Sequence, residues 1–287
     1  MPYQGIAPIL TGGSPWGLAR VARALREACR WNRGPDVYSP QFAWDGRVFA
    51  PDWSEQEDRL LAEAFQLPLE TDALVVDFAQ TSQGNCALVA TVKAAMKVFG
   101  RKLFKSVKRL EDGFRVTLRD GAVVSLTEEE VALARDSACL KGAASPTKTF
   151  AIFAYAVAAA RRAQLMPAAD LKMGLVEGWL SEHQRFERAL EDLRSGQRPR
   201  HCANYLGVGS ETRVRAMAGE DPLLGESTVV SSFGHAVYVE RVDGTTLADH
   251  YGQSVPYDGT DTNGRPVRER LTFEGPGLKE EDGWFYI

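Results

Sequence analysis

The feature that most constrains this chain is a stretch from residue 87 to 99 that is apolar around nearly the whole circumference of a helix. Its sequence, ALVATVKAAMKVF, carries Leu, Val, Ala, Met and Phe side chains on almost every side. Such a helix is stable only when other elements cover it, because a surface helix keeps one polar face. The sequence therefore predicts a central helix that the rest of a globular protein encloses.

A single cysteine, Cys86, stands at the start of this helix, directly after the polar segment SQGN. A thiol in the first turn of a helix lies near the positive end of the helix dipole, which favours the nucleophilic thiolate. The structural alternative is a small buried residue, since free cysteine is among the most buried residue types. The polar neighbours favour the nucleophile, because they do not belong in a core and Gly84 permits a tight turn.

Composition excludes several classes of protein. The chain has 287 residues, of which 44% are hydrophobic and 25% charged, enough for one large or two modest domains. A net charge of -4 without a basic face argues against a nucleic-acid partner. The four cysteines are far apart and form no C-x-x-C pair, which predicts reduced thiols and no structural zinc site.

The chain shows no targeting or membrane-spanning pattern. Its first residues, MPYQGIAPIL, lack the basic and long apolar segments of a secretory signal. The longest uncharged apolar stretch, FAIFAYAVAAA, is shorter than the roughly 18 residues that a spanning helix needs. We expect no membrane span, and a protein that is cytoplasmic or exported by a route that uses no signal peptide.

Local patterns predict a mixed α+β fold. Ser54 and Thr127 each precede a glutamate by three residues, the capping-box spacing of a helix start, and Ser145 precedes a proline. Alternating apolar residues predict short strands over 104–126 and again after residue 207. Three parts are expected. Residues 1–75 form an N-terminal helical extension of unknown role, residues 76–206 a helical lobe with the nucleophilic cysteine, and residues 207–287 a β lobe with the histidine and the aspartate.

A nucleophilic thiol needs a base and a group that orients the base. Of the four histidines, His183 and His201 lie in charged segments and are expected to face solvent. His235 opens an apolar strand, where an unpartnered ring would be costly. Asp249 follows on the next strand, and Cys, His and carboxylate in this order suit a catalytic triad. His250 is the alternative for the third position.

Four motifs give the chain a resemblance to a known family. Gln80 stands six residues before Cys86, the cysteine opens the helix as CALVA, the histidine lies in GHAVYV, and the carboxylate lies in DHYG. In order and spacing these are similar to the papain-like cysteine peptidases, and most of all to bacterial calpain-like catalytic domains. The resemblance covers roughly residues 75–260 and implies a two-lobed papain-like fold.

The resemblance also implies a reaction. Cys86, His235 and Asp249 would cleave peptide bonds through a thioester acyl-enzyme, with Gln80 and the backbone N–H of Cys86 holding the oxyanion. Gln83 is the rival to Gln80 for that donor. No cofactor and no metal would be needed, and the partner would be a protein or peptide substrate; the sequence leaves the oligomeric state open.

Two departures from the family keep other functions open. Ala87 replaces the aromatic residue that commonly follows the cysteine, and Asp249 replaces the usual asparagine. Aspartate at this position also occurs in transglutaminase-like enzymes, arylamine acyltransferases and bacterial effector proteases. A deamidase or transglutaminase-like enzyme, which includes a bacterial effector, and a non-catalytic papain-like binding protein are therefore the alternatives.

The strand pairing raises a difficulty for the triad. A two-residue turn at Asp243 and Gly244 would set Asp249 opposite Tyr238, not beside His235. We therefore predict a wider turn or a bulge around residues 241–244 that shifts the pairing and brings Asp249 to His235.

Overall fold

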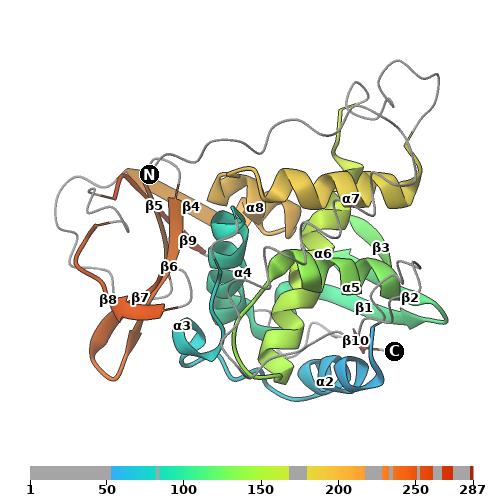
Figure 1. Ribbon diagram of the computed structural model, residues 1–287, viewed down its shortest axis with the longest axis horizontal. Coiled ribbons are helices and arrows are strands. Elements are labelled where there is room, and N and C mark those ends of the chain that lie inside the picture. The colour runs from blue at the N-terminus through green and yellow to red at the C-terminus, as the bar shows by residue number, and fades with distance from the viewer. Residues whose placement is uncertain are drawn as a thin grey trace, which may run out of the picture.

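The computed structural model describes residues 53–81, 84–167, 180–216, 228–232, 235–250, 253–260, 267–273 and 285–286. Its helices are α2 (Glu55–Gln66), α3 (Leu74–Asp77), α4 (Cys86–Phe99), α5 (Glu128–Ala138), α6 (Pro146–Gln164), α7 (Glu182–Leu193) and α8 (Pro199–Tyr205). Two short 3₁₀ helices, η1 (Gly100–Leu103) and η3 (Gly209–Glu211), complete the helical elements of the described residues. Residues 1–52 of the predicted N-terminal helical extension lie outside them. Helix α4 stands between the other helices and a sheet of C-terminal strands (Figure 1).

Two sheets flank the helices. The smaller one has the strand order β10-β1-β2-β3, with β1 (Phe104–Leu110), β2 (Gly113–Leu118), β3 (Val123–Thr127) and β10 (Phe285–Tyr286). The larger one has the order β4-β9-β5-β6-β7-β8 and is antiparallel throughout. Its strands are β4 (Thr212–Ala216), β5 (Thr228–Ser232), β6 (His235–Val242), β7 (Thr245–His250), β8 (Gln253–Pro256) and β9 (Glu269–Phe273). The α+β class predicted from the sequence is confirmed.

The helix starts follow the predicted caps. In α2 the backbone N–H of Glu57 donates to the Ser54 hydroxyl, and the Glu57 carboxylate accepts from the Ser54 backbone. Thr127 and Glu130 make the same reciprocal pair at α5. Ser145 caps α6 ahead of Pro146. These starts were predictable because every partner lies within one helical turn.

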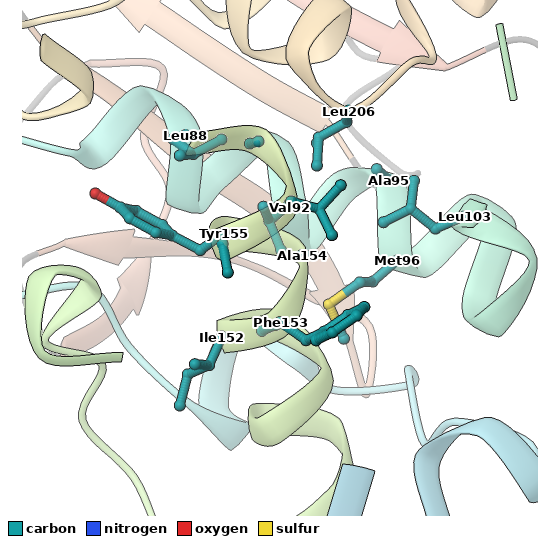
Figure 2. Packing of buried hydrophobic residues seen from close by; sticks show 14 of the residues in the cluster. Leu88, Val92, Ala95, Met96, Leu103, Ile152, Phe153, Ala154, Tyr155 and Leu206 are labelled. Atoms are coloured by element: carbon teal, nitrogen blue, oxygen red, sulfur yellow. The ribbon is translucent and has the colours of Figure 1, made fainter. Parts of the chain in front are cut away.

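The predicted central helix is confirmed, because α4 is buried along nearly its whole length. Leu88, Val92 and Met96 of α4 pack against Phe153 and Tyr155 of α6 in the main core (Figure 2). Covering both helices removes a large apolar area from water, and each Å² of apolar surface buried stabilises the fold by about 25 cal/mol. Apolar burial thus fixes α4, and with it the cysteine at its first residue.

The six-stranded sheet has a different environment on each face. Ala236 and Tyr238 of β6 belong to the main core together with α4. Val237 and Val239 of the same strand belong to a second, smaller cluster with Ala248. Since side chains alternate along a strand, every residue of β6 and β7 can be assigned to the α4 face or to the opposite face.

The hairpin between β6 and β7 closes with a two-residue turn. Asp243 and Gly244 have φ angles of 48° and 80°, and Val242 pairs with Thr245. The same register continues without a shift to Val239 and Ala248. The predicted wider turn is therefore wrong. Positive φ at both central positions gives a turn whose twist matches that of the strands, and Asp-Gly is a preferred sequence for it.

Segments from different parts of the chain share one core. Phe65 of α2 lies 5.4 Å from Phe150 and 5.6 Å from Phe153 of α6, measured between ring centroids. At the other end of the chain, β10 pairs with β1 in parallel. Within the described residues, no helix is long and apolar enough to cross a membrane.

The cysteines differ in state. Cys86 and Cys202 are free and buried, whereas Cys139 is disulfide-bonded. The expectation that all four cysteines are reduced is therefore wrong for Cys139. Cys29 lies outside the described residues.

Candidate active site

Cys86 is the first residue of α4 and only 6% exposed. Burial raises the pKa of its thiol, since the charged thiolate loses its hydration. The backbone N–H groups of Ala236, Ala87 and Cys86 itself act in the opposite direction, but burial outweighs them. The helix-start position predicted the lowering effect of the N–H groups on this pKa, whereas the larger effect of burial is that of the alternative, a small buried cysteine.

The thiol lies at the beginning of β6. The backbone N–H of Ala236 faces Cys86, and His235 is the residue directly before Ala236. This approach follows from the packing of α4 against β6, through the main core that both elements share. The structure thus brings the predicted nucleophile to the strand that begins with the predicted base.

The ring of His235 is mostly buried and has another histidine as its neighbour. Its centroid lies 6.0 Å from that of His250, and the two ring planes are 29° apart. His235 lies on the same face of β6 as Val237 and Val239, and His250 lies on the same face of β7 as Ala248, because residues two apart in a strand share a face. Both imidazoles therefore lie on the sheet face that points away from α4.

Asp249 lies on the α4 face and is almost completely buried. Its Oδ2 atom is 2.7 Å from Nζ of Lys93 and accepts from the backbone N–H of Gln80 at 3.3 Å. Its Oδ1 atom makes no hydrogen bond within the described part of the chain. The structure thus places Asp249 with Lys93 and Gln80, on the opposite sheet face from the His235 ring.

Gln80 is 1% exposed and held by Asp249 through two bonds. Besides the backbone contact, its Nε2 atom donates to the Asp249 carbonyl at 3.4 Å. The preceding residue, Ala79, exchanges two backbone hydrogen bonds with Lys141, of 3.0 and 2.9 Å. The segment before Cys86 is therefore held both by Asp249 and by Lys141. Gln83, the rival donor, lies outside the described residues.

Lys93 is the residue of this region that the sequence analysis missed. Its side chain is fully buried in α4, and its ammonium donates to the Phe78 carbonyl as well as to Asp249. Burial lowers the pKa of Lys93, and the negative charges of Asp249, Glu240 and Asp77 act to raise it. A lysine within a helix predicted to be buried on most sides was the signal, because a buried ammonium needs a partner.

Two further features fix the start of α4. Asn85 is completely buried, and its amide nitrogen donates to the Ala138 carbonyl at 3.0 Å. At Gly84 an added Cβ atom would lie 2.1 Å from the Arg194 carbonyl oxygen. The glycine is therefore required by a close backbone approach, in addition to the turn that the sequence indicated.

No protein-family model, curated protein or solved structure matches this chain. Among the described residues, no group of three or more His, Cys, Asp or Glu side chains is placed to hold a metal ion.

Proposed function

We propose that this protein is a cysteine-dependent acyl-transfer enzyme that cleaves peptide bonds, with Cys86 as nucleophile and His235 as base. The observation that carries the proposal is the meeting of the first residue of α4 with the first residues of β6, where the Ala236 N–H faces the thiol. An enclosed helix with a cysteine at its start, packed against a β-sheet with a histidine at the start of a strand, supports a papain-like arrangement of two lobes.

The reaction needs only these groups and water. Cys86 attacks the carbonyl carbon of an amide while its proton passes to His235. The C–N bond then breaks, His235 gives the proton to the leaving amine, and an acyl thioester remains on Cys86. Water loses a proton to His235 and attacks the thioester, which releases a carboxylic acid and returns the proton to the sulfur.

Gln80 is the proposed side-chain donor to the oxyanion, together with the backbone N–H of Cys86. The loss of one such donor costs about 3 to 4 kcal/mol of transition-state stabilisation in comparable sites. Among the described residues, the Nε2 atom of Gln80 makes one long bond, of 3.4 Å, to the Asp249 carbonyl. A bond of this length is weak, so exchanging it for an oxyanion costs little.

The proposal requires one rearrangement. His235 lies on the His250 side of the sheet, and burial raises the pKa of the Cys86 thiol. The imidazole must leave its stack with His250 and turn to the thiol when substrate binds. Catalytic hydrogen bonds often form only in the substrate complex, so the resting arrangement is compatible with this role.

A non-catalytic binding protein is the second candidate, and the burial of Cys86 favours it. A thiol whose pKa is raised by desolvation is typical of inert structural cysteines. The two candidates differ in what happens at the sulfur. An enzyme forms a covalent acyl adduct at Cys86, whereas a binding protein forms none.

The test is acylation by an activated ester and by a peptide library. We expect p-nitrophenyl acetate to acetylate Cys86, Cys86→Ala to abolish this, and Cys202→Ala, which removes the other free buried thiol, to leave it intact. New peptide termini in the library establish hydrolysis, and ammonia release without chain scission would indicate a deamidase instead. Absence of any adduct at Cys86 in the wild-type protein contradicts the proposal.

A further inference from the structure

The side of α4 that faces the large sheet carries three functional groups at helical spacing. Cys86 faces the Ala236 N–H, Lys93 bonds Asp249, and Lys97 lies 3.0 Å from the Glu240 carboxylate. Residues seven positions apart lie on the same side of a helix, about 10 Å apart along its axis. The proposed nucleophile and the buried lysine therefore contact the same hairpin, β6–β7, from one side of α4.

Lys93 joins three segments at a single atom. Its ammonium donates to the Phe78 carbonyl in the segment before the nucleophile and to Oδ2 of Asp249 in β7. The same carboxylate oxygen accepts from the backbone N–H of Gln80 at 3.3 Å, while the Gln80 side-chain amide donates to the backbone carbonyl of Asp249 at 3.4 Å. The backbone of Gln80 is thus linked to α4 through the carboxylate of the ion pair.

A buried ion pair is weak evidence for a role in stability alone. The cost of desolvating two charges often exceeds their attraction, and an apolar pair of similar volume is frequently as stable. Such a pair does fix geometry, because each charge must meet its partner at one distance and direction. Here the fixed geometry is that of the residue proposed to hold the oxyanion.

We propose that Lys93 and Asp249 are positioning residues that hold Gln80 in place relative to Cys86, and that Asp249 does not orient His235. The inference rests on the proposed function, since it assigns the ion pair to the oxyanion side of that site. It separates two roles that one carboxylate could have. A carboxylate that orients the base controls formation of the thiolate, whereas one that positions Gln80 controls only the step in which an oxyanion forms.

Two reagents distinguish these roles. Iodoacetamide alkylates a thiolate without forming an oxyanion, so its rate reports thiolate formation at Cys86. Acetylation by p-nitrophenyl acetate passes through a tetrahedral oxyanion, so its rate reports both steps. Both rates are measured against pH for the wild-type protein, Gln80→Ala and the double variant Lys93→Met/Asp249→Leu, which replaces the charges with apolar side chains of similar volume.

We expect the double variant to be acetylated about 10- to 100-fold more slowly, while its pH profile of alkylation matches that of the wild-type protein. Gln80→Ala should show the same pattern, and adding it to the double variant should have no further effect. An alkylation profile that moves in the double variant overturns the inference, because Asp249 would then act on the base. Unchanged acetylation also overturns it.

A third variant keeps the test decisive if the double variant does not fold. Asp249→Asn preserves the size and one acceptor oxygen but removes the charge that attracts Lys93. Acetylation should then be measurably slower, by up to about tenfold, with an unmoved alkylation profile. A moved profile or unchanged acetylation overturns the inference. Failure of the proposed function itself looks different, because the wild-type protein would then show no acetylation that depends on Cys86.

Discussion

Nζ of Lys93 lies 2.7 Å from Oδ2 of Asp249, and both side chains are almost completely excluded from solvent. This contact links α4 to the strand that follows the tight Asp243–Gly244 turn. Asp249 lies on the α4 side of the sheet because it alternates with Ala248 along β7, and there its carboxylate meets the Lys93 ammonium. The carboxylate that the sequence analysis assigned to His235 therefore forms an ion pair with Lys93 instead.

Breaking this pair from one side should be severe. Lys93→Met leaves a buried carboxylate without its counter-ion, so we expect the free energy of unfolding to fall by about 3 to 5 kcal/mol. Arg188→Met is the control, because it also removes one positive charge but from an exposed pair with Glu191, worth about 0 to 1 kcal/mol. Urea unfolding of both variants measures the difference. Similar losses in the two variants would contradict the assignment.

Local signals in the sequence determined much of the fold. The caps at Ser54 and Thr127 and the Asp243–Gly244 turn depend on neighbours within a few residues, so they could be predicted. The wider turn was inferred from the needs of the triad, against the local signal, and it was wrong. Functional expectation was a weaker guide there than turn chemistry.

The partners of the candidate site residues could not be predicted in the same way. Whether Asp249 meets His235 or Lys93 depends on which face of β7 packs against α4, and this is set by contacts far apart in the chain. The raised pKa of Cys86 likewise depends on how completely other elements cover it. The burial of Lys93 could have been predicted from the sequence, since this lysine stands within an otherwise mostly apolar helix.

The two free thiols of the described residues, Cys86 and Cys202, should react in a defined order. Cys86 is 6% exposed at a helix start, whereas Cys202 is 0% exposed within α8. We expect iodoacetamide to alkylate Cys86 first in the folded protein, at a rate that increases as pH rises toward its raised pKa. Peptide mapping after partial labelling checks the order. Faster labelling of Cys202 would remove the basis for Cys86 as the nucleophile.

Cys202 should make stability depend on alkaline pH. Burial raises the pKa of its thiol well above the ordinary value. A group with a raised pKa in the folded state stabilises fully below its unfolded pKa, and this contribution is lost as pH rises toward the folded value. Compared with Cys202→Ala, the wild-type protein should therefore lose more unfolding free energy as pH rises above about 9. Urea unfolding of both proteins at pH 7 and pH 10 measures this difference. An equal loss of unfolding free energy in the two proteins between these pH values would contradict the prediction.

Gly84 should be required for the position of the nucleophile. In Gly84→Ala the new Cβ atom would lie 2.1 Å from the Arg194 carbonyl oxygen, so the start of α4 must move. We expect lower stability together with a changed rate of Cys86 alkylation. Gly244→Ala is the control, because φ is 80° there and nothing lies within 4 Å of the added atom. It should cost about 1 to 3 kcal/mol through backbone strain and leave alkylation unchanged.

The last prediction concerns the resting position of the base. The His235 and His250 rings are stacked with centroids 6.0 Å apart, on the side of the sheet away from α4. If His235 must leave this stack to reach Cys86, weakening the stack should favour the turned position. An aromatic pair contributes about 0.5 to 1.5 kcal/mol. His250→Ala should therefore speed the acetylation of Cys86 by about two- to tenfold, since the population of the reactive arrangement increases by that factor.

His250→Phe is the matched control, because it keeps an aromatic ring against His235 and should leave the acetylation rate near that of the wild-type protein. Equal rates in the Ala and Phe variants would mean that the stack does not compete with the reactive position. A loss of a hundredfold or more in His250→Ala, with Asp249→Asn nearly silent, would instead assign to His250 the task of orienting His235. The sign of the His250→Ala effect therefore separates a neighbour that holds the base in reserve from one that the base needs during the reaction.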